Sequence, residues 1–274
     1  MAHVLIPTDF SDNALNAAIY AVRLFGEEGN TFTLLHAYRM PHGTAGAMWN
    51  VAEMLAHDAK EDLGEFHKQL LNALPDMKPE FELCCEHGDL PNVVNRFKAD
   101  PVPPDLVVMG TQGASGLKET LFGSNTASVI KTQGLPVLAV PEKAIYRSPK
   151  RILLADDGGP TDKPALKVLM DIARWSHSEV MIVRVVNEEV GTEDTGTSTA
   201  LDDVLGAIPR SHHYLSGDNV EKALNDMADQ NDVDLVVVMH RQRGLFDQFF
   251  KPSISTKWVM HTHIPMLVLV QSAR

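Results

Sequence analysis

The chain has 274 residues and a formal net charge of −12, with 44% hydrophobic and 22% charged residues. This composition is typical of a globular protein with enough apolar material for one large domain or two ordinary ones. The acidic balance argues against nucleic acid or anionic lipid as a main partner, and no apolar run reaches the roughly 18 residues of a membrane helix.

Strands and helices alternate through the first half of the chain. After Met1-Ala2-His3 the sequence enters an apolar strand directly, without the regions of a signal peptide, so we expect a cytoplasmic protein. Short β-branched runs predict strands, and apolar residues at helical spacing predict helices between them. The predicted strands are 4–7, 31–38, 81–86, 105–109 and 136–141, and the predicted helices are 12–25, 48–74, 88–99 and 125–133. This order predicts a parallel sheet with helices on both faces.

A glycine-spaced stretch, residues 109–126, lies between the fourth strand and the fourth helix. Glycines let the backbone approach a ligand, and N–H groups at a helix start point toward negative charge. We therefore expect phosphate binding at Gly110, Gly113, Gly123 and Ser124, with Ser124 or Asn125 as the helix N-cap. The alternative is a plain turn. The stretch is neither a P-loop, which needs Gly-Lys-Ser/Thr, nor the dinucleotide fingerprint, whose glycines lie closer together.

The second half of the chain repeats the first. Residues 152–157 repeat 4–9 at an offset of 148, and residues 234–239 repeat 105–110 at an offset of 129. The difference, 148 − 129 = 19, means that the second copy is shorter in its middle, where residues 191–206 form a polar loop with at most a short helix. We expect two domains, residues 1–143 and 151–274, joined by a polar linker.

Several features of the first half are similar to one known family. They are Gly110 and Gly113, then nine residues before Gly123-Ser124; the strand end Pro7-Thr8-Asp9; and the segment Leu34-Leu35-His36-Ala37. On these features the chain resembles the universal stress protein family in its tandem form, over essentially the whole sequence. The resemblance implies two α/β domains, each a doubly wound, five-stranded parallel sheet with helices on both faces, of the adenine-nucleotide α-hydrolase-like type.

The resemblance also implies an ATP site in the first domain, in the crevice at the carboxyl ends of the strands, where open α/β sheets bind ligands. Asp9 would lie near the ribose and phosphates and help to hold Mg²⁺; alternatively, it is a cap or turn carboxylate. The residues expected to contact the nucleotide are Pro7, Thr8, Asp9, Ala37, Met109, Gly110, Gln112, Gly113, Gly123, Ser124, Asn125 and Thr126.

The second copy departs from this pattern. Asp157 keeps the place of Asp9, but His-Arg-Gln-Arg at 240–243 stands where the first two glycines stood. Lys251-Pro252 falls where Gly123-Ser124 was, and proline removes a donor N–H. We predict that this half does not bind ATP in the family manner. Its loop arginines either receive another anion or lie in a solvated loop.

No Ser-His-Asp, His-Glu-x-x-His or Cys-His signature indicates catalysis, and any ATP hydrolysis should be slow. We expect a cytoplasmic stress-response protein whose first domain binds ATP and Mg²⁺ and acts as a nucleotide-dependent switch or regulator for a protein signalling partner. The alternatives are a scaffold or dimerisation module without nucleotide, or an ATP-dependent enzyme, although the loop of a ligase is absent. The family suggests pairing of the fifth strands, 136–140 and 265–270, as an intramolecular pseudo-dimer, with a homodimer as a further option.

Overall fold

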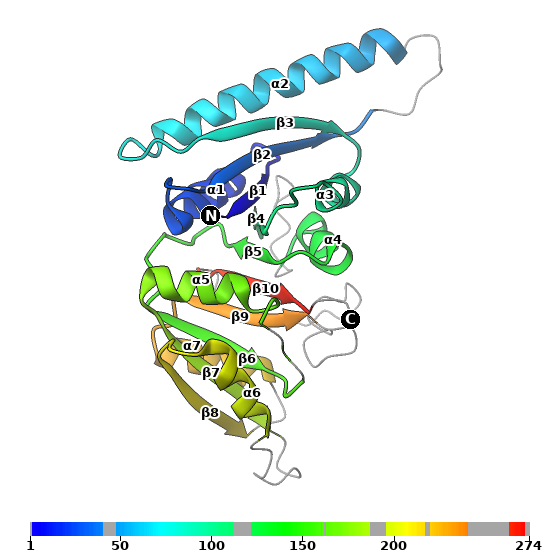
Figure 1. Cartoon of the computed structure of the whole chain (residues 1–274). Coiled ribbons are helices and arrows are strands. Elements are labelled where there is room, and N and C mark those ends of the chain that lie inside the picture. Colours follow the sequence, from blue (N-terminus) through cyan, green and yellow to red (C-terminus); the bar gives the residue numbers. More distant parts are fainter. Residues whose placement is uncertain are drawn as a thin grey trace. The chain divides into compact units, whose positions relative to one another are not determined.

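The computed structural model describes residues 2–40, 48–111, 122–159, 161, 163–186, 196–216, 220–240 and 263–271. The chain divides into two compact units, the first ending at Glu142 and the second beginning at Lys143. The predicted fold class is confirmed, because each unit is an α/β unit with five strands in parallel pairs (Figure 1). Among the described helices, none has the length and apolar composition needed to cross a membrane.

The first unit orders its strands β3-β2-β1-β4-β5. Its elements are β1 (His3–Pro7), α1 (Asp12–Phe25), β2 (Thr31–Tyr38), α2 (Met48–Asn72), β3 (Phe81–His87), α3 (Leu90–Lys98), β4 (Leu106–Gly110), α4 (Ser124–Gln133) and β5 (Val137–Val140). The chain runs outward from β1 to β3 and then crosses back to β4 on the other side of β1. The sheet therefore changes direction of winding between β1 and β4, where open α/β sheets form a crevice.

Burial explains why the central strands read as unbroken apolar runs. Val4, Leu5 and Ile6 of β1 have no exposed surface, and neither have the four residues of β5. Such strands need cover on both faces. Helix α1 contacts α2, and α3 contacts α4. With right-handed crossovers, these two pairs lie on opposite faces of the sheet.

The second unit orders its strands β10-β9-β6-β7-β8. Its elements are β6 (Arg151–Asp156), α5 (Lys167–Ser176), β7 (Glu179–Val186), α6 (Gly196–Leu205), β8 (Arg210–Ser216), α7 (Val220–Gln230), β9 (Leu235–His240) and β10 (Met266–Val270). Helix α6 has 10 residues where α2 has 25, a difference of 25 − 10 = 15 that accounts for most of the 19 residues missing from the second copy. The suggested pairing of the fifth strands concerns how the two units are placed and stays a prediction.

One predicted helix cap is wrong. The N-cap of α4 is Gly123, and neither Ser124 nor Asn125 takes that place, because the helix already begins at Ser124. Gly123 has extended backbone angles, φ −60° and ψ 161°, and its carbonyl accepts the first helical hydrogen bond, from Ala127 N–H at 3.0 Å. Without a side chain, this cap offers no acceptor to the N–H groups of the first turn.

Candidate functional site

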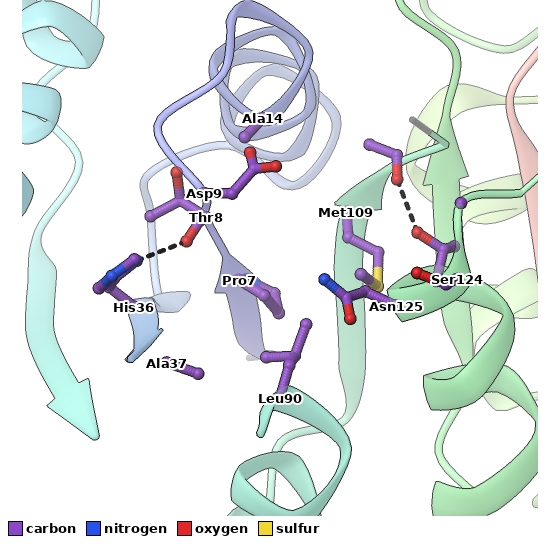
Figure 2. Close-up of a pocket in the computed structure, with 13 residues that line it drawn as sticks. Pro7, Thr8, Asp9, Ala14, His36, Ala37, Leu90, Met109, Ser124 and Asn125 are labelled. Atoms are coloured by element: carbon purple, nitrogen blue, oxygen red, sulfur yellow. Dashed lines mark hydrogen bonds between the residues drawn. The ribbon is translucent and has the colours of Figure 1, made fainter. Parts of the chain in front are cut away.

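A pocket of about 240 Å³ opens at the carboxyl ends of β1, β2 and β4, beside the N-terminus of α4 (Figure 2). It lies at the point where the winding of the first sheet reverses. Its volume falls just below the range of roughly 300–1,000 Å³ for small-molecule sites, with residues 112–121 lying outside the described part of the chain.

Ten of the twelve residues predicted to contact a nucleotide line this pocket. The other two, Gln112 and Gly113, lie outside the described residues. Three lining residues were missed by the sequence analysis: Ala14 of α1, His36 of β2 and Leu90 at the start of α3. The predicted residues in the lining are Pro7, Thr8, Asp9, Ala37, Met109, Gly110, Gly123, Ser124, Asn125 and Thr126.

The turn between β1 and α1 is held by its own side chains. The Thr8 hydroxyl accepts a hydrogen bond from Phe10 N–H at 2.9 Å. Asp9 Oδ1 accepts from the Ser11 hydroxyl at 2.6 Å and from Ser11 N–H at 3.2 Å. Ser11 is also the N-cap of α1, where its oxygen accepts from Ala14 N–H. The Asp9 carboxylate thus has both a turn role and an exposed place on the pocket wall.

His36 closes the same turn from β2. Its Nδ1 lies 2.9 Å from the backbone carbonyl oxygen of Thr8 (Figure 2). Its ring stacks on Phe10 with 4.3 Å between ring centroids. Phe10 has a φ of 65°, a left-handed conformation that is unusual for an aromatic residue. The sequence signal for His36 was only its position beside Ala37 at the end of a predicted strand.

On the opposite wall, β4 meets α1 and α4 at very short range. A Cβ on Gly110 would lie 2.6 Å from Nδ2 of Asn13, so only glycine fits here without a shift. Gly110 does not have a positive φ, so close approach is the reason for the glycine. The Thr126 hydroxyl donates to the Gly110 carbonyl at 2.8 Å, and Thr126 is only 3% exposed. These contacts fix the start of α4 against the end of β4.

The first turn of α4 gives this wall its electrostatic character. Gly123 N–H donates to the Thr111 carbonyl, and the next residues, from Ser124 to Thr126, line the pocket at the start of α4. The first N–H groups of a helix have no partner within the helix and carry its positive dipole end. Among the described lining residues none is Lys or Arg. The start of α4 therefore favours negative charge at this wall.

The second unit builds the same turn with different side chains. Gly158 N–H donates to Asp156 Oδ1 at 3.0 Å, as Phe10 N–H donates to Thr8. Gly158 has φ 76°, close to that of Phe10. Asp156 is 7% exposed and forms an ion pair with Arg184, whose Nε lies 3.0 Å from Oδ2. The corresponding loop after β9, residues 241–262, lies outside the described residues.

Outside the pocket, the described part of the chain also contains side chains of the types that bind metals, and two cysteine thiols. Among the described residues, no group of three or more His, Cys, Asp and Glu converges as a metal ligand set. Cys84 and Cys85 are free thiols. Burial, followed by the charges of Glu86 and Glu82, raises the pKa of Cys84 to about 11. A thiol with this pKa is a poor nucleophile at neutral pH.

Comparisons with known proteins match both halves of the chain. The model of the universal stress protein family matches residues 1–141 and 149–270. Universal stress protein MJ0577 of Methanocaldococcus jannaschii is 28% identical over 159 residues, 51% of this chain and 94% of that protein. Universal stress protein YxiE of Bacillus subtilis is 28% identical over 145 residues, 50% of this chain and 97% of that protein. The crystal structure of a universal stress protein from Archaeoglobus fulgidus has a TM-score of 0.69 at 21% identity and covers 99% of this chain and 97% of its own.

Proposed function

The chain belongs to the universal stress protein family, and from that premise we propose that its first unit binds ATP with Mg²⁺ and acts as a nucleotide-dependent regulator in the cytoplasm. One observation carries the proposal. Residues from β1, β2, β4 and the start of α4, chosen on sequence grounds as nucleotide contacts, line a single pocket. The pocket lies where open α/β sheets bind ligands.

The wall at α4 suits the phosphates. Ser124, Asn125 and Thr126 place backbone N–H groups at the pocket, and the helix dipole favours negative charge there. The opposite wall suits the nucleoside, because Pro7, Ala37 and Leu90 present apolar surface beside Met109.

A divalent cation fits this donor set. Mg²⁺ is commonly bound by one or two carboxylates together with phosphate oxygens and waters, so a full protein cage is not required. Among the described lining residues, Asp9 supplies the one carboxylate. The cation would offset the repulsion between Asp9 and the phosphates, which explains why an acidic residue is compatible with a polyphosphate.

We extend the proposal to the second unit, which would not bind ATP in this way. The fifth residue of β9 is Met239, at the register position that Gly110 holds in β4. The place of the first glycine therefore falls on Met239, and the expectation that residues 240–243 take the places of both glycines is wrong for Gly110. Met239 is 4% exposed, so its side chain fills space next to the strand end. Asp156 and Arg184 add a buried ion pair where the first unit has Thr8 and His36.

Any hydrolysis would be slow. Rapid phosphoryl transfer needs cationic groups that stabilise charge in the transition state. The described lining of the pocket contains no Lys or Arg. Bound ATP would therefore persist long enough to act as a signal, with the occupied state recognised by a protein partner.

Isothermal titration of ATP into nucleotide-free protein tests the proposal, with and without Mg²⁺. We expect saturation near one site per chain. Asp9→Asn keeps the oxygen that accepts from Ser11 and removes the charge, so it should lower affinity roughly tenfold or more only when Mg²⁺ is present. Asp12→Asn is the matched control, because Asp12 is an exposed acid in the first turn of α1 outside the pocket.

Two results of the titration would contradict the proposal or part of it. No binding by wild-type protein at millimolar ATP would contradict the proposal and favour the scaffold alternative. Equal affinities for the Asp9 and Asp12 variants with Mg²⁺ would leave ATP binding in place and reject the metal role of Asp9.

A further inference from the structure

We propose that His36 is a positioning residue of the pocket: its imidazole binds the Thr8 carbonyl in place of a β-ladder partner and so leaves the backbone N–H of Ala37 open to a ligand. The identity of that ligand rests on the proposed function. The backbone arrangement itself can be tested without any ligand.

The hydrogen-bonded ladder between β1 and β2 ends before the last residues of β2. The last ladder pair is Pro7 with Leu35, and beyond it Thr8 N–H donates to the Leu35 carbonyl at 2.8 Å. Every second residue of a strand faces the same neighbour, so Ala37 has its N–H and C=O on the same side as Leu35. Tyr38 faces the other side, where its carbonyl accepts from Gly88 N–H. A continued parallel ladder would pair Ala37 N–H with the Thr8 carbonyl.

His36 supplies that carbonyl with a different donor. Its Nδ1 lies 2.9 Å from the Thr8 oxygen, and a carbonyl can only accept, so Nδ1 carries the proton. The ring is held on its face by Phe10, at 4.3 Å between centroids. The Thr8 carbonyl is therefore satisfied without Ala37. Ala37, whose backbone faces the space that β1 has left, is one of the residues that line the pocket.

The second unit provides an internal comparison. Asp156 and Arg184 occupy the places of Thr8 and His36, one residue beyond the pair Ala155 with Val183. Here the Arg184 guanidinium binds the Asp156 carboxylate, not a backbone carbonyl. The ladder in this unit continues through Asp156 and Arg184, one pair further than in the first unit. In the second unit the Arg184 side chain does not bind the backbone carbonyl of Asp156, and β6 and β7 stay paired at these two residues.

An open Ala37 backbone would favour one chemical class of ligand. Ala37 presents one donor and one acceptor side by side at the wall away from α4, which matches a flat heterocycle with an adjacent acceptor and donor on one edge. An inorganic polyphosphate has no such edge. His36 should therefore affect the binding of a whole nucleotide and not the binding of its phosphates.

The test uses two variants of the full chain. His36→Phe keeps a ring on Phe10 and removes the donor, whereas His36→Asn keeps an amide donor near the place of Nδ1. The first readout is hydrogen exchange of the Ala37 amide, measured by ¹⁵N NMR without ligand. We expect fast exchange in wild type and His36→Asn, and exchange at least tenfold slower in His36→Phe because the amide pairs with Thr8.

The second readout is affinity for ATP and for inorganic tripolyphosphate, each with Mg²⁺. His36→Phe should weaken ATP roughly tenfold and leave tripolyphosphate unchanged, with partial recovery in His36→Asn. Unchanged Ala37 exchange in His36→Phe would overturn the inference, as would equal losses for both ligands. If wild type binds no ATP, the proposed function fails, and the exchange readout alone decides on His36.

Discussion

Gly110→Ala introduces one methyl group where β4 meets α1, and its cost follows from distances. The new Cβ would lie 2.6 Å from Nδ2 and 2.7 Å from Cγ of Asn13, well inside normal contact. Asn13 is 6% exposed, so its side chain has little room to move. Overpacking of this kind costs about 1–3 kcal/mol. Loss of glycine entropy in the unfolded chain offsets about 0.4–1 kcal/mol, which leaves a net loss of roughly 1–2 kcal/mol.

Urea unfolding followed by circular dichroism measures this loss. With an m-value of about 2 kcal/mol/M, the transition of the first unit should move down by about 0.5–1 M. Gly64→Ala is the matched control, because its Cβ meets nothing within 4 Å inside α2, and it should stabilise by about 0.5–1 kcal/mol. In an Asn13→Ala background, Gly110→Ala should cost about 1 kcal/mol less. If Gly110→Ala stabilises as Gly64→Ala does, the close approach is refuted.

Three further predictions concern other contacts. Thr126→Val leaves the Gly110 carbonyl without its 2.8 Å donor and should destabilise the first unit by about 1–3 kcal/mol in urea unfolding; no change would mean that water replaces the hydroxyl. Asp156→Asn weakens the buried pair with Arg184 and should lower the stability of the second unit by about 3 kcal/mol in the same assay, whereas a gain would show the pair to be unfavourable. Because the pKa of Cys84 is raised to about 11, its alkylation by iodoacetamide at pH 8, located by mass spectrometry, should be roughly 100-fold slower than that of an ordinary thiol and should speed up as pH rises; an ordinary rate would contradict the raised pKa.

Strong local signals explain what the sequence predicted well. The strand Thr31–Tyr38 and the helix Asp12–Phe25 have the predicted bounds. Both segments combine a clear periodicity with a capping residue or a turn at each end. The family and the fold class are confirmed: the family model matches both halves of the chain, and each unit has the expected alternation of strands and helices.

The parts of the site that were missed depend on backbone geometry. His36 lines the pocket and binds the Thr8 carbonyl just beyond the last β1–β2 pair, and no residue pattern reveals this arrangement. Gly110 was expected to contact a phosphate, which stays a prediction; its close packing on Asn13, which also requires the absence of a Cβ, was not foreseen. The cap of α4 was predicted from the preference of Ser and Asn for that position, but Gly123 occupies it.

The central claim is that ATP binds in the first unit alone, at the ends of β1 and β4. Hydrogen exchange of the full chain, compared with and without ATP and Mg²⁺, tests it most directly. We expect ATP with Mg²⁺ to slow the hydrogen exchange of the amides at 8–9, Ala37 and 124–126, and to leave exchange at 156–159 in the second unit unchanged. Protection at 156–159, or no protection anywhere at saturating ATP, would contradict it.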